Sequence, residues 1–328
     1  MFSQPGEEDR SGRGTRRSAG RGTVEDQTGI FVRRMDEVDL LRILELRETV
    51  RWSGDPRAFD LLRGMGEARW AVAEDSSDAR VVGMVGAVPL GEVGILCHLA
   101  VHDGHRGLGL GLRLTRWAVS YLLSRGVKVV RLDSTRSAEG LYRSMGFEPI
   151  FGRTEYRLEG EALDTRLREG RYRGTWGAGP GEGQRVAPLL FGDLPELFGV
   201  DLWSYGADRS ALIMAILRRY PGWGLVARDA TGRIQGYLVR SASGSTVRIG
   251  PLMASSPGVA RVLLVRALET HDGRSVEVSL PAPKGSPAHE LLYEFGFVGR
   301  RDRLRMELGE ASPTQGLRAY GTTPYLAT

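Results

Sequence analysis

A glycine-rich, basic turn between a strand-like run and a helix-like run constrains this chain more than any other segment. The apolar run from Val93 to Val101 is typical of a strand, and the segment from Leu110 to Arg125 has the amphipathic pattern of a helix. Between them stands the sequence Arg106-Gly107-Leu108-Gly109-Leu110-Gly111. The first N–H groups of a helix have no partner within the helix, and its dipole adds positive potential there. Because glycine lets a phosphate approach the backbone, this turn predicts a phosphate-binding site.

The order of strand-like and helix-like runs occurs twice along the chain. The first unit, residues 29–158, has the pattern of a strand, two helices, three strands, a helix, a strand, a helix and a final strand region. The second unit, residues 185–310, repeats this order from its helix onward. Each unit finishes with a helix, a Gly-Phe pair and a strand, at Gly146-Phe147 and at Gly296-Phe297. The repetition predicts an internal duplication, and 328 residues are enough for two separate cores.

Three segments lack the pattern of a packed element. Residues 1–28 combine Gly, Ser, Arg and acidic residues with almost no large apolar side chain, which predicts a disordered tail. Residues 159–184 pass from charged residues to a glycine-rich run and are expected to be a linker. Residues 311–328 are expected to form an irregular C-terminal tail.

Composition excludes several classes of protein. A single cysteine, Cys97, excludes an intrachain disulfide framework and a multi-cysteine zinc site, and it favours a cytoplasmic location. No apolar run is long enough to span a membrane, and the N-terminus has no apolar signal-peptide core. The net charge of +5 suits an anionic ligand or a nucleic acid, but a solvated basic surface explains it as well. We therefore expect no membrane partner and no nucleic-acid partner.

Two motifs of the first unit resemble those of the GCN5-related N-acetyltransferase (GNAT) superfamily. The run Arg106 to Gly111, after the strand end Leu99-Ala100-Val101, fits the signature Arg/Gln-x-x-Gly-x-Gly/Ala. The run Ala138 to Phe147 fits the second signature, Ala-x-x-Leu-Tyr-x-x-x-Gly-Phe. The whole chain is similar to bacterial tandem acetyltransferases with a degenerate second domain. This wider resemblance depends on Trp52-Ser53, Asp201, Asp208-Arg209 and Ile249-Gly250-Pro251-Leu252.

The resemblance implies an α/β (α+β) fold class with two tandem GNAT folds. Each fold would be a mixed, mostly antiparallel twisted sheet flanked by helices. Residues 29–158 would form the catalytic domain, and residues 185–310 a degenerate GNAT-like domain.

The resemblance also implies an acyltransferase that moves acetyl from acetyl-coenzyme A to a primary amine by direct attack in a ternary complex. Backbone N–H groups of Arg106 to Gly111 would hold the cofactor pyrophosphate, with the arginine adding charge. The strand ending Leu99-Ala100-Val101 would splay from its neighbour and pair with the pantetheine amides. An N–H of that strand would stabilise the oxyanion. Acetyl-coenzyme A is thus the expected co-substrate, and no metal is expected.

Candidate catalytic residues flank the turn. Tyr142 stands at the general-acid position of the family, where a phenol would protonate the departing thiolate, although it could also only pack on its helix. The general base is not visible in the sequence. His98 adjoins the splayed strand and is the first candidate, with a buried structural histidine as the alternative, and Glu92 is weaker. Trp52 is a candidate for contact with the acceptor, together with Trp203 and Tyr205, although aromatic residues are more often core residues.

The second unit departs from the family pattern. Its equivalent turn, Gly250 to Gly258, lacks the arginine and the glycine spacing, and Leu292 stands where the first unit has Tyr142. We therefore expect one catalytic domain and one without cofactor binding. Alternatives are a tandem enzyme with another acyl donor or acceptor, as in mycothiol synthesis, and a non-enzymatic acyl-coenzyme A sensor. The expected partner is a small-molecule or peptide amine, and a homodimer is an open expectation.

Overall fold

The computed structural model describes residues 24–25, 29–50, 52, 56–168, 185–269, 275–280, 286–310 and 316–321. Most of the expected N-terminal tail lies outside these residues, as do Ser53, residues 169–184 of the expected linker and most of the expected C-terminal tail. The described residues up to 168 are called the first half of the chain, and those from 185 onward are called the second half.

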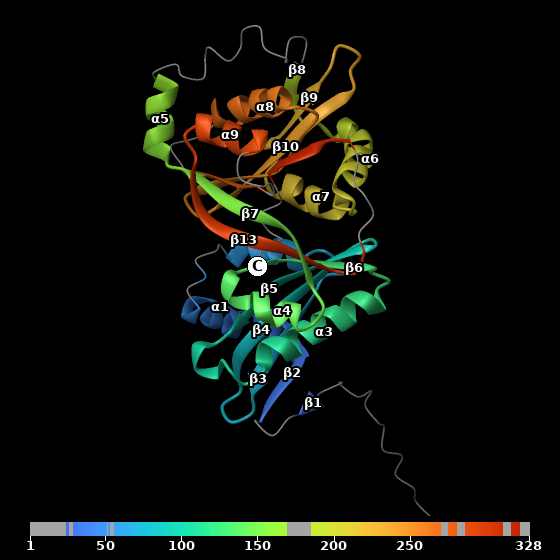
Figure 1. Ribbon diagram of the computed structural model, residues 1–328, viewed down its shortest axis with the longest axis vertical. Helices are drawn as coiled ribbons and strands as arrows, with labels where there is room; N and C mark the ends of the chain where they lie inside the picture. Colours follow the sequence, from blue (N-terminus) through green and yellow to red (C-terminus); the bar gives the residue numbers. More distant parts are fainter. Residues whose placement is uncertain are drawn as a thin grey trace, which may run out of the picture.

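In the described residues, fourteen strands form one sheet that runs through both halves of the molecule (Figure 1). The strand order is β1-β2-β3-β4-β5-β6-β13-β7-β12-β11-β10-β9-β8, with β14 paired to β11. Two pairs, β5–β6 and β11–β12, are parallel, and the other pairs are antiparallel. The predicted fold class, a mixed and mostly antiparallel sheet with helices, is confirmed. The strands are β1 Val24–Glu25, β2 Ile30–Arg34, β3 Arg69–Asp75, β4 Arg80–Leu90, β5 Val93–Val101, β6 Val129–Ser134, β7 Glu148–Leu158, β8 Arg185–Pro188, β9 Gly224–Arg228, β10 Ile234–Ser243, β11 Thr246–Ala254, β12 Ser275–Leu280, β13 Val298–Leu308 and β14 Arg318–Gly321.

Helices cover both faces of this sheet. In α3, apolar residues four positions apart (Leu110, Leu114, Ala118 and Leu122) are buried on one face of the sheet, because this spacing puts them on one side of a helix. In the described residues no helix is both long enough and apolar enough to cross a membrane. The helices are α1 Leu40–Thr49, α2 Pro56–Arg63, α3 Leu110–Ser124, α4 Glu139–Arg143, α5 Gly160–Arg168, α6 Leu194–Tyr205, α7 Ser210–Arg219, α8 Pro257–Glu269 and α9 Pro287–Glu294.

The two halves share a hydrophobic core. Ile43 of α1 and Phe59 of α2 belong to the same cluster of buried residues as Leu197 of α6 and Ile213 of α7. Two further clusters lie under α3 and α4 in the first half and under α8 and α9 in the second. The helices of the two halves thus meet on the face of the sheet opposite α3.

The two halves also exchange a strand. β13 comes from the second half, yet it pairs with β6 of the first half, from Leu304 opposite Ser134 to Leu308 opposite Val130. β7 comes from the first half, yet it pairs with β12 of the second. β7 and β13 lie side by side between the halves, as the green and red strands of Figure 1 show. Neither half has its complete sheet without a strand from the other.

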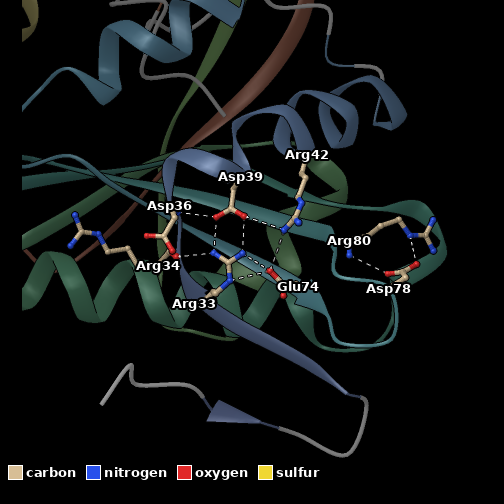
Figure 2. A network of polar contacts seen from close by, with 8 residues as sticks. All are labelled: Arg33, Arg34, Asp36, Asp39, Arg42, Glu74, Asp78 and Arg80. Carbon is tan, nitrogen blue, oxygen red and sulfur yellow. Dashed lines mark hydrogen bonds and ion pairs between the residues drawn. The ribbon is translucent and has the colours of Figure 1, made fainter. Parts of the chain in front are cut away.

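A polar network fastens α1 to the edge of the first half (Figure 2). The guanidinium of Arg33 on β2 donates to both oxygens of Asp39, over 2.6 and 2.7 Å, and also to Glu74 on β3. Asp39 in turn accepts the N–H of Asp36 over 2.8 Å, just before α1 begins. These contacts join β2, β3 and the start of α1, as in a structural cluster.

Three segments expected to be irregular contain regular elements. α5 lies in the expected linker, where Leu163 is fully buried in the core of the second half. β14 lies in the expected C-terminal tail, with Tyr320 only 4% exposed. The two-residue strand β1 lies in the expected N-terminal tail and pairs with β2. α5 and β14 are formed through contacts with distant parts of the chain, which a local sequence pattern does not reveal.

Candidate active site

The parallel strands β5 and β6 part to form a fork. They pair only from Val93 opposite Val129 to Ile95 opposite Arg131. Beyond Ile95, the segment toward Val101 pairs with β4 on one side and, within the described residues, with no strand on the other. The predicted splaying of the strand that ends in Leu99-Ala100-Val101 is confirmed. An open strand edge of this kind presents N–H and C=O groups to a ligand.

A bulge interrupts β5 within the fork. Ala100 pairs with Met84 and Cys97 with Gly86, so His98 and Leu99 together face Val85. His98 has φ +54°, a left-handed conformation that is uncommon for a residue other than glycine. Bulges are frequent next to active sites, where they redirect a side chain or a backbone group.

The glycine-rich turn leads from β5 into α3. A short 3₁₀ turn, Asp103–His105, comes first, and Gly107 and Gly109 then have φ +81° and +72°. A Cβ atom on either glycine would meet no atom within 4 Å, so the space above the turn is open. In the described residues the N–H groups of Gly107 to Leu112 donate to no protein group, and helical bonding begins with Arg113 N–H to Gly109 C=O over 3.1 Å. These are the free donors that a phosphate site requires.

Arg106 stands at the start of this turn with its side chain in solvent. Its guanidinium is 2.7 Å from the Asp103 carboxylate, and both side chains are about two-thirds exposed. Exposed ion pairs contribute little to stability, so Arg106 can exchange Asp103 for a phosphate at small cost.

Tyr142 lies in α4, on the same face of the sheet as α3. A Cβ on Gly111 would be 3.3 Å from Leu141 Cδ2, so α4 lies directly against the first turn of α3. Tyr142 is 2% exposed and contacts Phe147 edge to face, and the described residues provide no hydrogen-bond partner for its hydroxyl. Burial raises the pKa of Tyr142 well above that of an ordinary phenol, so its hydroxyl is protonated at neutral pH.

His98 lies on the opposite face, among aromatic residues of the first half. Its ring centroid is 6.0 Å from that of Trp52 and 5.8 Å from that of Phe59, and its Nδ1 is buried without a hydrogen-bond partner. Burial, assisted by the charge of Arg47, lowers the pKa of His98 to about 3. The imidazole is therefore neutral and a weak base near pH 7. Trp52 is half-buried and lies beside His98.

Other ionisable residues of this region are buried or paired. Cys97 is fully buried, and burial raises the pKa of its thiol to about 12, so no thiolate forms near neutral pH. Glu92 lies at the far end of β5 and pairs with Lys128 over 2.5 Å, away from the fork's open end. His102 and His105 contact each other, and His105 also contacts Asp75, which fastens the 3₁₀ turn to the neighbouring hairpin.

Tyr205, a candidate for contact with the acceptor, lies instead in a polar cluster beside β6. Tyr205 of α6 lies under Arg209, whose guanidinium carbon is 3.6 Å from the ring centroid, and near Arg131 of β6 at 5.7 Å. Burial alone would raise the pKa of Tyr205, but the charges of Arg305, Arg209 and Arg131 together lower it. One feature of the sequence indicates this cluster. Charged residues stand at every second position of two strands, at Arg131 and Asp133 and at Arg303, Arg305 and Glu307. Such alternation indicates a polar face.

Comparison with known proteins gives both halves the same description. A family model described as an acetyltransferase (GNAT) domain matches residues 66–149, and another with the same description matches residues 198–321. The human N-acetyltransferase 8B is 38% identical over 92 residues, which are 25% of this chain and 39% of that protein. The chain thus spans well under two thirds of this relative. The uncharacterised N-acetyltransferase YitH of Bacillus subtilis is 22% identical over 222 residues, 66% of this chain and 70% of that protein.

The fold also occurs among solved structures. A candidate acetyltransferase from Pyrococcus horikoshii has a TM-score of 0.73 at 19% identity, covering 94% of this chain and 99% of that one. At this level of identity, the likeness concerns the fold, and it extends over both halves.

Proposed function

Since this chain belongs to the GNAT superfamily and carries two GNAT domains in tandem, we propose that its first domain transfers an acetyl group from acetyl-coenzyme A to a primary amine. The observation that carries the proposal is the set of unpaired N–H groups from Gly107 to Leu112, beside the open edge of β5. A diphosphate and an amide-bearing arm are complementary to these two features.

The proposal gives each part of the cofactor its own residues. The pyrophosphate accepts hydrogen bonds from the turn Arg106 to Gly111, and the Arg106 side chain adds charge. The pantetheine amides pair with the backbone of Leu99, Ala100 and Val101 as a further strand. The thioester then lies at the fork, next to the bulge at His98.

The reaction is direct attack of the amine on the thioester carbonyl carbon. A C–N bond forms, the C–S bond breaks, and a backbone N–H of the bulge stabilises the oxyanion between these steps. Tyr142 donates its proton to the departing thiolate. The ammonium group of the substrate must give a proton to a base. His98 can act as this base only if bound substrate raises the pKa of its imidazole. We propose that the amine, on a small molecule or a peptide, approaches from the side of Trp52.

Calorimetric titration with acetyl-coenzyme A tests the cofactor site. We expect Gly109→Glu to weaken binding roughly tenfold or more, because a carboxylate side chain would repel the phosphates at the turn. Gly232→Glu is the matched control, since Gly232 also has positive φ and open space around it, but lies in a turn of the second domain. Absence of binding by the intact chain, or equal binding by Gly109→Glu, would remove the proposal.

Turnover with a panel of amines and acyl donors tests the chemistry. We expect Tyr142→Phe to lower kcat by about 10²-fold or more without changing the affinity for acetyl-coenzyme A, because only proton donation is lost. Tyr293→Phe is the control, because Tyr293 lies on the equivalent helix of the second domain and is exposed. Full activity of Tyr142→Phe would exclude the acid role. Binding without turnover of any amine would favour the sensor alternative.

A further inference from the structure

The second domain contains a fork like that of β5 and β6. β11 has nine residues, as β5 has, and it pairs in parallel with β12 only from Thr246 opposite Ser275 to Ile249 opposite Val278. Its pairing with β10 shifts register at Gly250 and Pro251, within one residue of the equivalent bulge in β5. When the two strands are aligned end to end, Leu252, Met253 and Ala254 correspond to Leu99, Ala100 and Val101.

The strand β14 fills this second fork. Leu252 pairs with Gly321, Met253 with Ala319 and Ala254 with Arg318. The three paired residues of β11 are the counterparts of those proposed to bind pantetheine in the first domain. The edge that is open in the first domain is therefore occupied in the second by the chain itself.

The fit of β14 is close. A Cβ on Gly321 would lie 3.2 Å from Val278 Cγ1 and 3.5 Å from the Ile249 carbonyl oxygen, so Gly321 sits where β11 and β12 diverge. Tyr320 is buried in the core of the second domain, at 4% exposure. The N–H of Leu317 donates to Ser204 Oγ over 3.0 Å. β14 is therefore held by its backbone pairing, by the buried side chain of Tyr320 and by the hydrogen bond from Leu317 to Ser204.

In the described residues, the phosphate end of the second fork offers fewer unpaired N–H groups than the start of α3. α8 begins at Pro257, which has no N–H, and the N–H of Val259 donates to Ser256 Oγ over 3.3 Å. The fork of the second domain therefore accommodates an additional strand, but the turn beside it is not suited to a diphosphate.

We propose that β14 is a built-in ligand that takes, in the second domain, the place of the pantetheine arm of acyl-coenzyme A, so that each chain binds a single acyl-coenzyme A. The inference rests on the proposed function, because it takes the fork of β5 and β6 as the pantetheine site. A peptide strand suits this place because pantetheine also pairs through amides with an exposed strand edge.

Cofactor stoichiometry is the first test. We expect calorimetry with coenzyme A to give one site per intact chain and no remaining site in Gly109→Glu. A site that survives in Gly109→Glu would show that the second domain accepts the cofactor, which overturns the inference. If the intact chain binds no coenzyme A, the proposed function fails, and the next experiment still decides whether β14 is a ligand.

The second test releases β14 from the folded full-length chain. A specific protease site placed within residues 311–315 is cut after folding, and a fluorescent peptide of residues 316–328 is added in excess. We expect this peptide to replace the cut segment at one peptide per chain. The Tyr320→Ala peptide should bind roughly tenfold more weakly, because a buried aromatic anchor is lost. The Arg318→Ala peptide is the control, since Arg318 is exposed. Failure of the peptide to bind, or equal binding by the Tyr320→Ala peptide, would overturn the inference.

Discussion

Arg305 of β13 donates from Nε to Oδ1 of Asp133 on β6 over 2.6 Å, and the two strands come from opposite halves of the chain. Arg153 of β7 binds the other oxygen of the same carboxylate. One carboxylate of the first half thus meets guanidinium groups of two exchanged strands, in a place where all three side chains are buried. The two domains are therefore joined by the ion pairs of this buried cluster as well as by the apolar contacts of their shared core.

Replacement of Asp133 should therefore destabilise the whole protein. We expect Asp133→Ala to lower the free energy of unfolding by about 3–5 kcal/mol, since it leaves two buried guanidinium groups without this carboxylate. Denaturant unfolding measures the change. Glu92→Ala is the control, because the Glu92–Lys128 pair is exposed and should contribute about 0–1 kcal/mol. A loss no larger than that of the control would contradict a structural role for the cluster.

The contribution of Asp133 should also depend on pH. Burial alone would raise its pKa, but the charges of Arg153 and Arg305 lower it to about 2. Because the pKa in the folded protein is below its unfolded value of about 3.9, the stabilisation is complete above about pH 4 and is lost as the pH falls toward 2. The stability difference between wild type and Asp133→Ala should shrink over this interval.

Strand exchange predicts that neither half folds alone. We expect residues 1–176 and 177–328, expressed separately, to be insoluble or unfolded, because the first piece lacks β13 beside β6 and the second lacks β7 beside β12. Co-expression should restore a complex that a tag on one piece recovers. A second piece ending at Gly296, which lacks β13, should not rescue the first. A soluble, folded first piece on its own would contradict the role of the exchange.

The strand exchange marks the limit of what the sequence could predict. Residues 148–158 and 298–308 both follow a helix and a Gly-Phe pair, so the local pattern predicts two similar final strands. Either strand could pair with β6, and only packing between the halves decides which one does. The same holds for β14, whose short run resembles a tail until β11 supplies its pairing partner.

The conformation of the glycine-rich turn at Gly107 and Gly109 was predictable for the opposite reason. Its geometry depends on glycines at fixed positions between a strand and a helix, and that information is local. The environment of His98 depends on Trp52 and Phe59, which are far from it in the sequence, so its lowered pKa could not be derived from position alone. The cluster around Tyr205 likewise assembles residues from α6, β6 and β13.

His98 should stay neutral well below the pH at which an ordinary histidine is charged. Its folded pKa of about 3 lies below the unfolded value of about 6.5, so its contribution to stability is complete above pH 6.5 and is lost as the pH falls toward 3. His98→Asn removes this proton uptake, and asparagine tolerates the left-handed backbone at this position. Between pH 8 and pH 5 the variant should therefore lose about 1–2 kcal/mol less stability than wild type. Denaturant unfolding at both pH values measures the difference, and the pH profile of kcat/KM should be the same for both proteins in its acid limb. Equal stability losses, together with an acid limb that disappears in His98→Asn, would instead identify His98 as a titrating base.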